Sequence, residues 1–235
     1  MEQHTADPGG GTPPRPSDAA RDAAAPYTAP FLAAYDLWVI RLSNPYAWQC
    51  SSQTMLDLYN EHTGARHLEI GPGSGWYLAH AELPSGVSIT LMDLNPTPMA
   101  YTQRRVDNAH RHVRTVTGNI LDPVPAAAGT EFDSIGLNFV MHCVPGPMSE
   151  KGVAFQHLAQ VLADNGTLFG STILNRRPRT MFGRALSFAY GRVGAFNNAD
   201  DDRPELENSL RKAFREYSIA EVGDVTLFTA RKPRR

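Results

Sequence analysis

The sequence has little of what several classes of protein require. Cysteine occurs only twice in 235 residues, as Cys50 and Cys143, which is too few for a four-cysteine zinc site or a disulfide framework. No run approaches the roughly 20 apolar residues of a membrane-spanning helix, and no basic segment followed by an apolar one opens the chain. We therefore expect reduced thiols, a soluble cytoplasmic protein and no membrane partner.

A large excess of charge of either sign is also missing. Lys and Arg number 22 and Asp and Glu number 24, which gives a net charge of -2. This balance provides no global positive field, and so we expect no nucleic-acid partner. With 42% hydrophobic residues, a chain of this length can bury the core of one large domain. Residues 1–26 are rich in Pro, Gly, Ala and charge, and this composition predicts a disordered tail.

The first part of the predicted domain, residues 27–63, has the pattern of two helices and forms a predicted helical lid. Apolar residues recur there at spacings of four, three and four, and they are Phe31, Tyr35, Trp38 and Leu42. This spacing predicts one face of an α-helix, which Asn44-Pro45 is expected to end. Ser51 or Ser52 is a suitable N-cap for a second helix through about Tyr59.

Beyond Gly64, short apolar runs alternate with helical segments. The predicted strands are residues 66–70, 87–93, 112–117, 132–140 and 167–174, and the predicted helices are residues 74–82, 96–109 and 148–163. This alternation predicts an α/β fold with a doubly wound, mainly parallel sheet in residues 64–174. Residues 175–216 are expected to form a cap insertion and a helix. The closing runs in residues 217–231, separated only by Gly223-Asp224, predict an antiparallel hairpin that completes a seven-stranded sheet.

A carboxylate and a glycine run follow one another in the string RHLEIGPGSGWYL. Glu69 precedes Gly71, Gly73 and Gly75 at the end of the first predicted strand, where a ligand of a parallel sheet approaches the backbone. A dinucleotide fingerprint would need a further glycine or alanine where Trp76 or Leu78 stands. A pyrophosphate would also be repelled by Glu69. A zwitterionic ligand with an ammonium and a sulfonium group, such as S-adenosylmethionine, fits better.

Three further strand ends carry polar groups that suit this ligand. Asp93 ends the second predicted strand and is expected to accept both ribose hydroxyls, while Leu94 flanks the adenine. Asn119 and Ile120 end the third strand and are expected to contact the base. Asn138 ends the fourth strand and is expected to reach either the methionine part or the acceptor, or to bond only to backbone.

The strings LEIGPGSG, LMDLN, GNIL and FDSIGLNFV, in this order, resemble the four ligand-binding motifs of class I S-adenosylmethionine-dependent methyltransferases. The resemblance covers residues 66–230. It departs from the family at Asn119, where many members have Asp. It implies a Rossmann-like fold with a closing antiparallel pair and S-adenosyl-L-methionine as cofactor.

A narrower resemblance covers nearly all of the chain beyond residue 26. YTAPFLAAYDLWVIRLSNPYAWQC, GWYLAH, MHCVPG and GTLFGSTIL are similar to the N-methyltransferases of toxoflavin biosynthesis. These enzymes act on ring nitrogens of 7-azapteridines. The resemblance implies a small planar heterocycle as substrate and a place in antibiotic biosynthesis.

Methyl transfer is an in-line displacement that needs alignment more than a strong base, and so no catalytic residue is obligatory. The aromatic residues expected to stack a flat acceptor are Tyr27, Trp38, Tyr46, Trp48, Trp76 and Tyr77. His142 follows the fourth strand and is either a general base near the acceptor or a packed histidine. No metal is expected, because the fourth and fifth strands end in Asn138 and Asn175 rather than in carboxylates.

Some alternatives stay open at the level of sequence. A basic segment contains Arg176, Arg177, Arg179, Arg184 and Arg192, and it is either a solvated insertion or a cap that attracts a polar heterocycle. The acceptor atom could be oxygen or carbon of another natural product instead of nitrogen. The chain could also bind the cofactor without catalysis. The sequence predicts no oligomeric state.

Overall fold

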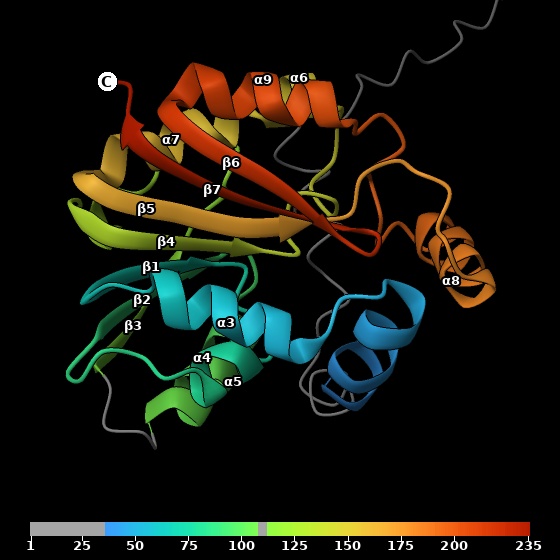
Figure 1. The fold of residues 1–235 in the computed structure, drawn as a ribbon. Helices are drawn as coiled ribbons and strands as arrows, with labels where there is room; N and C mark the ends of the chain where they lie inside the picture. Colours follow the sequence, from blue (N-terminus) through green and yellow to red (C-terminus); the bar gives the residue numbers. More distant parts are fainter. Residues whose placement is uncertain (1–35, 108–111) are drawn as a thin grey trace, which may run out of the picture.

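A computed structural model describes residues 36–107 and 112–235 (Figure 1). The predicted disordered tail and Tyr27 lie outside the described residues, and so does the side chain of Trp38. Within the described ranges, no helix combines the length and the apolar character needed to span a membrane.

Seven strands form a single sheet in the order β3-β2-β1-β4-β5-β7-β6. Their bounds are β1 Arg66–Ile70, β2 Ser88–Asp93, β3 His112–Thr117, β4 Phe132–Asn138, β5 Leu162–Thr172, β6 Phe214–Val222 and β7 Val225–Pro233. The first five strands are parallel to one another, whereas β7 runs antiparallel to both β5 and β6. The predicted mainly parallel α/β sheet with a closing hairpin is therefore confirmed.

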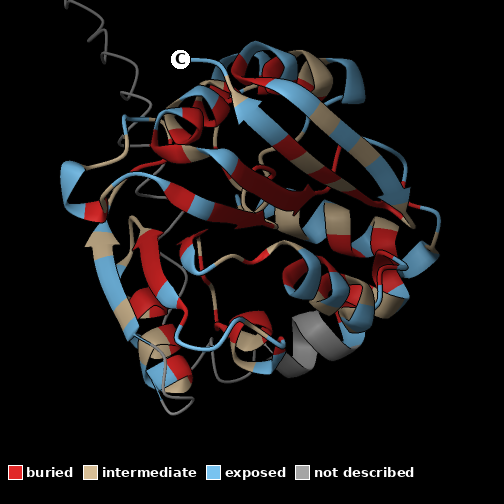
Figure 2. Ribbon diagram, turned by 60° about the vertical axis from the view of Figure 1, so that its left-hand side comes forward, coloured by how far each residue is buried: buried red, intermediate tan, exposed pale blue. Residues whose placement is uncertain are grey.

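Helices cover both faces of this sheet (Figure 1). Their bounds are η1 Asp36–Ala47, α3 Ser52–His62, α4 Trp76–His80, α5 Pro96–Asp107, the short η2 Ala126–Ala128, α6 Met148–Lys151, α7 Val153–Val161, α8 Met181–Arg192 and α9 Arg203–Ala213. Buried side chains of α6, α7 and α9 form one hydrophobic cluster with the sheet, and those of α3, α4, α5 and α8 form a second one. The central strands are buried on both faces, as in other parallel sheets, whereas the edge strands β3 and β6 are largely exposed (Figure 2).

The first helix differs from the prediction at Pro45. We expected Asn44-Pro45 to end it, but η1 is a π-helix that contains Pro45 and continues to Ala47. The backbone N–H of Trp48 donates to Ser43 O, five residues back, at 3.1 Å. Proline has no N–H to donate, but the wider spacing of the π-helix lets the next turn close past it.

The predicted second helix is confirmed and is slightly longer than expected. Ser51 is its N-cap and accepts a hydrogen bond from Thr54 N at 3.0 Å. The helix predicted for residues 148–163 is instead two helices that meet at Gly152. A Cβ at Gly152 would lie 2.2 Å from Ser209 Oγ of α9. The close approach of α9 at this point therefore requires glycine. β5 begins at Leu162, five residues before the strand predicted from residue 167.

The hairpin turns at Gly223-Asp224, as predicted, with Val222 paired to Val225. Gly223 has a φ of 60°, which glycine adopts at little cost. The N–H of Asp224 donates to Trp48 O at 2.8 Å. The closing hairpin thus holds the residue that follows η1, although the two are far apart in the sequence.

Candidate functional site

A cavity opens at the carboxyl ends of β1, β2, β3 and β4. It encloses about 850 Å³ of space, a volume that includes the open solvent at its mouth. In the strand order, β1 has β2 on one side and β4 on the other. After β1 the chain therefore adds β2 and β3 on one side of β1, and it later returns to add β4 on the other side of β1. Ligands of open α/β sheets bind in the crevice at such a switch point.

The turn after β1 brings bare backbone to the cavity. Gly71 and Gly73 line it with φ angles of 61° and 54°. A Cβ at Gly71 would lie 2.6 Å from Val140 Cγ2, whereas one at Gly73 would meet no atom within 4 Å. Gly73 therefore leaves an open space that a side chain would fill, and this space can admit a ligand to the backbone.

Gly75 does not lie with Gly71 and Gly73 at the cavity, although we predicted that all three would contact the ligand. It is not among the residues that line the cavity. It precedes α4 with a φ of 68°, and a Cβ there would lie 2.6 Å from Thr102 Cγ2 of α5. In this structure its small size serves the packing of the turn against α5, and a contact with ligand stays a prediction.

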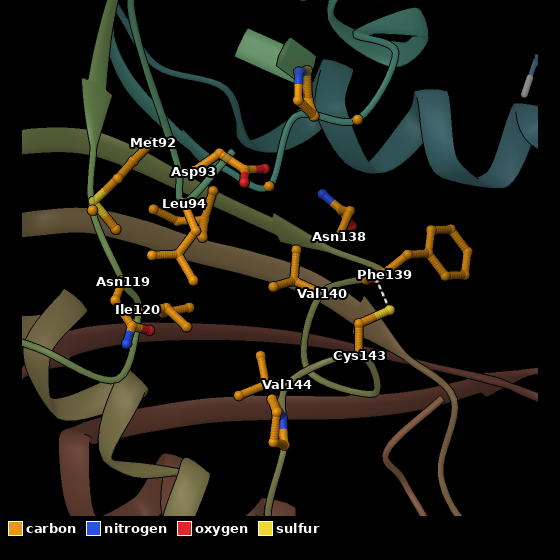
Figure 3. A pocket seen from close by; sticks show the side chains of 16 residues that line it. Met92, Asp93, Leu94, Asn119, Ile120, Asn138, Phe139, Val140, Cys143 and Val144 are labelled. Carbon is orange, nitrogen blue, oxygen red and sulfur yellow. Dashed lines mark hydrogen bonds between the residues drawn. The ribbon is translucent and has the colours of Figure 1, made fainter. Parts of the chain in front are cut away.

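Asp93 lies at the tip of β2 and faces the cavity (Figure 3). One carboxylate oxygen, Oδ1, accepts a hydrogen bond from Asn95 N at 2.8 Å. Burial raises the pKa of Asp93 to about 6, although the backbone hydrogen bonds of Asn95 and Leu94 oppose this. A carboxylate held in this partly dry position is suited to accept hydrogen bonds from ligand hydroxyls.

Leu94, Asn119 and Ile120, which we predicted to surround adenine, all line the cavity. Asn119 Oδ1 accepts a hydrogen bond from Leu121 N at 3.0 Å, which fixes the direction of its amide. Figure 3 shows Asn119 and Ile120 at one end of the site, with Val144 facing them from the loop after β4. This end combines apolar side chains with one amide, as a flat heterocyclic base requires.

Asn138 at the end of β4 lies between Leu94 and Phe139 in the view of Figure 3 and lines the cavity. Its side-chain nitrogen and oxygen are both buried, and neither makes a hydrogen bond of good geometry with any described residue. Burial, assisted by the charge of Glu69, raises the pKa of the nearby Tyr59 hydroxyl well above its usual value, and the Asn138 amide opposes this rise. Buried amides without partners are rare and costly, and so these atoms indicate a place for a ligand.

Glu69 is buried behind the cavity and is not among its lining residues. Its Oε1 accepts a hydrogen bond from the Tyr59 hydroxyl at 2.6 Å, and its Oε2 lies 2.9 Å from His67 Nε2. The other ring nitrogen of His67 lies 2.9 Å from Ser134 Oγ. A Cβ at Gly136 would lie 2.2 Å from Glu69 Oε2. The carboxylate is thus held inside the protein, and its predicted contact with a ligand stays a prediction.

Four of the aromatic residues predicted to bind the acceptor have described side chains, and none of these four lines this cavity. Trp48 is only 2% exposed and packs against Phe196 at 5.7 Å between ring centroids. Tyr77 accepts a hydrogen bond from Asn44 Nδ2 at 3.0 Å, and Trp76 stacks on His80 at 4.2 Å between ring centroids. Tyr46, in contrast, is 66% exposed. Their roles toward an acceptor stay predictions.

His142 is buried and is likewise absent from the cavity wall. Its Nδ1 accepts a weak hydrogen bond from Ile173 N at 3.4 Å, and its ring packs edge-on against Phe196. Burial, assisted by the positive charge of Lys151, lowers the pKa of His142 to about 3. The ring is therefore neutral near pH 7, and this environment matches the packed histidine of the two alternatives.

Most of the cavity wall that follows β4 was not predicted from the sequence. Phe139, Val140, Cys143, Val144 and Pro145 all line the cavity. Phe139 has a φ of 57°, which is unusual for a bulky residue and marks strain of the kind found at functional sites. Its ring points away from Asp93 and Ile120 (Figure 3). The position of this loop at the switch point was the signal that could have found these residues.

Three of the five arginines named in the basic segment bond to acidic or backbone groups. Arg176 contacts Glu221 at 2.6 Å, and Arg179 lies 3.6 Å from Asp224. Arg184 donates to Pro178 O at 3.0 Å. None of the predicted arginines is among the cavity residues in the described part of the chain. The same part holds no cluster of three or more His, Cys, Asp or Glu side chains arranged for a metal ion.

Comparison with known proteins agrees with this geometry. The family described as "Methyltransferase domain" matches residues 47–217. The Physcion biosynthesis cluster O-methyltransferase of Aspergillus chevalieri is 34% identical over 210 residues, with 88% of this chain and 94% of the relative covered. The Demethylluteothin O-methyltransferase of Streptomyces thioluteus is 36% identical over 211 residues, with 89% and 90% covered.

Solved structures share the fold at lower identity. The N-methyltransferase NodS from Bradyrhizobium japonicum WM9, in complex with S-adenosyl-L-homocysteine, has a TM-score of 0.56 and 15% identity. The alignment covers 93% of this chain and 98% of that one. The DhpI-SAH complex has a TM-score of 0.62 and 17% identity, with 93% and 99% covered.

Proposed function

This chain belongs to the family of class I S-adenosylmethionine-dependent methyltransferases, and we propose that it methylates a hydroxyl oxygen of a small, flat natural product. The observation that carries the proposal is the placement of Asp93 and the buried Asn138 amide in one cavity at the switch point of the sheet. The two relatives named as O-methyltransferases support oxygen as the acceptor atom.

The residues present fit the cofactor. When bound, S-adenosylmethionine supplies a methyl group on a positively charged sulfur. Asp93 would accept the ribose hydroxyls, and Leu94 and Ile120 would enclose the adenine, with the Asn119 amide at its edge. The open backbone at Gly73 would receive the amino-acid part, and the buried amide of Asn138 would gain the hydrogen bonds that it lacks among the described residues.

The chain's own contribution to methyl transfer is alignment and the exclusion of water. Among the described residues that line the cavity, Asp93 is the only carboxylate, and the lining contains no His, Lys or Arg. Asp93 would be occupied by ribose, and so the cavity wall offers no general base for the acceptor. An acceptor that contacts only these described residues would have to bring a nucleophile that is ready at neutral pH, such as an acidic phenol or enol.

A ring nitrogen with a lone pair meets the same requirement, and methylation of an azapteridine of the toxoflavin type is the second candidate. The string HCVPG carries much of the resemblance that supports it, and its residues Cys143, Val144 and Pro145 line the cavity. A specific part of the resemblance thus lies where a ligand would contact it.

The test has two steps. Isothermal titration with S-adenosyl-L-homocysteine measures binding to the full chain. Reactions with S-adenosylmethionine then use a panel of hydroxylated aromatics of graded acidity and a didemethylated azapteridine, with mass spectrometry for methyl gain and NMR to locate the methyl group. We expect O-methylation, with kcat/KM rising as the acceptor hydroxyl becomes more acidic.

Each other outcome has its own meaning. Methyl gain on nitrogen alone would replace the first candidate by the second. Cofactor binding with no product from either class would contradict both acceptor assignments and favour another metabolite or a non-catalytic binding protein. Absence of binding would contradict the assignment of the cavity.

A further inference from the structure

Lys151, the last residue of α6, has a fully buried side chain. Its Nζ lies 2.7 Å from Asp201 Oδ2 and donates hydrogen bonds to Val144 O at 3.1 Å and Asn197 O at 3.0 Å. Val144 belongs to the loop after β4, and the other two belong to the segment between α8 and α9. One ammonium group therefore ties two irregular segments together.

Asn197 connects the same two segments a second time. Its backbone N–H donates to His142 O at 2.7 Å, and its side-chain Nδ2 donates to Cys143 O at 2.9 Å. The carbonyl oxygens of three consecutive loop residues, 142–144, are thus all bonded to Asn197 or Lys151. We refer to Lys151, Asn197 and Asp201 together as the clamp.

The loop that the clamp holds is a wall of the ligand cavity. Residues 139, 140, 143, 144 and 145 line the cavity, and Val144 faces the end where Ile120 lies (Figure 3). None of the clamp residues lines the cavity itself. They therefore act on a ligand only through the loop.

Stability alone does not account for this arrangement. Taking Lys151 and Asp201 out of water is costly, and burial lowers the pKa of the lysine and raises that of the aspartate. Apolar residues of similar volume often replace buried ion pairs with no loss of stability. Apolar residues, however, could not donate hydrogen bonds to the carbonyls of Val144 and Asn197. These hydrogen bonds fix where the loop lies.

We propose that Lys151, held by its ion pair with Asp201, is a positioning residue that fixes the loop of residues 139–145 and thereby sets the affinity of the cavity for the cofactor. This inference rests on the proposed function only in taking the cavity as the cofactor site. It assigns no contact between Lys151 and the ligand.

The test uses the double variant Lys151→Met/Asp201→Leu, which removes both charges together and so leaves no unpaired buried ion. Isothermal titration with S-adenosyl-L-homocysteine gives Kd, and hydrogen exchange follows the amides of Cys143 and Val144, which bond within the loop to Val140 O and Met141 O. We expect Kd to rise about tenfold and these amides to exchange faster, while amides of β1 and β4 keep their protection.

The control is the exposed pair formed by Lys232 and Glu216 on the hairpin strands, changed to Lys232→Gln/Glu216→Gln. It is expected to leave Kd and loop exchange unchanged. Should the double variant not fold, Asn197→Ala answers the same question, because it removes the bond to Cys143 O without leaving a buried charge unpaired. A rise of a few fold in Kd with faster loop exchange is expected.

Unchanged Kd in a folded clamp variant would overturn the proposal, whether or not the loop exchanged faster. A lower melting temperature with normal Kd and normal loop exchange would identify the clamp as purely structural. Failure of the unaltered protein to bind S-adenosyl-L-homocysteine would instead contradict the cofactor site and, with it, the reason for the clamp.

Discussion

The hydroxyl of Tyr59 donates a 2.6 Å hydrogen bond to Oε1 of Glu69, so that α3 is tied to β1 beneath the cavity. His67 lies 2.9 Å from the other carboxylate oxygen. The glutamate that we expected to face a positive ligand thus has both oxygens engaged by side chains of the protein. Its negative charge still lies below the turn that carries Gly71, and the hydrogen bonds fix the position of that charge.

Removing the hydrogen bond from Tyr59 to Glu69 should lower the free energy of unfolding more than removing a hydrogen bond between two neutral groups. Tyr59→Phe leaves a buried carboxylate with one partner fewer and should lower the free energy of unfolding by about 1–3 kcal/mol. Tyr77→Phe is the matched control, because that hydroxyl bonds to the neutral amide of Asn44, and about 1 kcal/mol is expected. Urea unfolding of both variants measures the difference. Equal losses would show that the charge of Glu69 adds nothing to the bond.

Asp93→Asn should weaken cofactor binding and at the same time stabilise the unliganded protein. The carboxylate is destabilised by burial, which raises its pKa to about 6. An amide keeps the acceptor for Asn95 N without this penalty, and so a gain of about 2 kcal/mol at pH 7 is expected. Thermal unfolding and titration with S-adenosyl-L-homocysteine measure the two effects. A variant that binds normally would contradict the ribose contact.

The same pKa predicts how binding varies with pH. In the proposed site the ionised form of Asp93 would accept both ribose hydroxyls, and this form is lost as the pH falls through about 6. Affinity for S-adenosyl-L-homocysteine should therefore drop on going from pH 7 to pH 5.

The free energy of unfolding of the unliganded protein should instead rise on going from pH 7 to pH 5. Because the folded-state pKa lies above the unfolded-state value, protonation of Asp93 favours the folded state between about pH 6 and pH 4. Asp93→Asn should remove both trends.

Much of the site could be predicted because it depends on local sequence. A glycine turn after a buried strand and an acidic residue at the tip of the next strand are short motifs, and Gly73, Asp93 and Ile120 indeed line one cavity. The hairpin was predictable for the same reason, since Gly223 permits the turn.

The remaining wall could not be predicted because it depends on contacts between distant segments. Val144 lines the cavity in a place fixed by Lys151, and Lys151 is held by Asp201 from a segment that the sequence analysis left as an insertion. Trp48 shows the same limit, because its ring packs against Phe196, which is far away in the sequence. Helical spacing indicates which residues share a face but not which distant residue covers that face.

Gly73→Ala should reduce ligand binding more than it reduces stability. The residue has a φ of 54°, and an added Cβ would meet no protein atom within 4 Å. The substitution therefore costs only the backbone strain of about 1 kcal/mol, but it places a methyl group in the cavity. Gly86→Ala is the matched control, because its φ is 71° and its Cβ would also meet nothing within 4 Å, although Gly86 does not line the cavity.

The two variants should lose similar stability in urea unfolding. Kd for S-adenosyl-L-homocysteine should rise about tenfold or more for Gly73→Ala, since a methyl group would lie where the ligand meets the backbone. It should not change for Gly86→Ala. An equal, small effect on Kd in both variants would show that the ligand does not approach the backbone at this turn.

Trp48 and Tyr46 were both predicted to stack a flat acceptor, but they differ in their surroundings. Trp48 is 2% exposed whereas Tyr46 is 66% exposed. Trp48→Ala should lower the free energy of unfolding by about 3–5 kcal/mol because it empties a packed site against Phe196, and Tyr46→Ala should change it by less than about 0.5 kcal/mol. The KM for the acceptor, measured once a substrate has been identified, decides the role of Tyr46. A higher KM in the stable Tyr46→Ala variant would assign that side chain to the acceptor site, and an unchanged KM would remove it from the predicted lid. A Trp48→Ala variant of normal stability would contradict its place in the core and return it to the acceptor side.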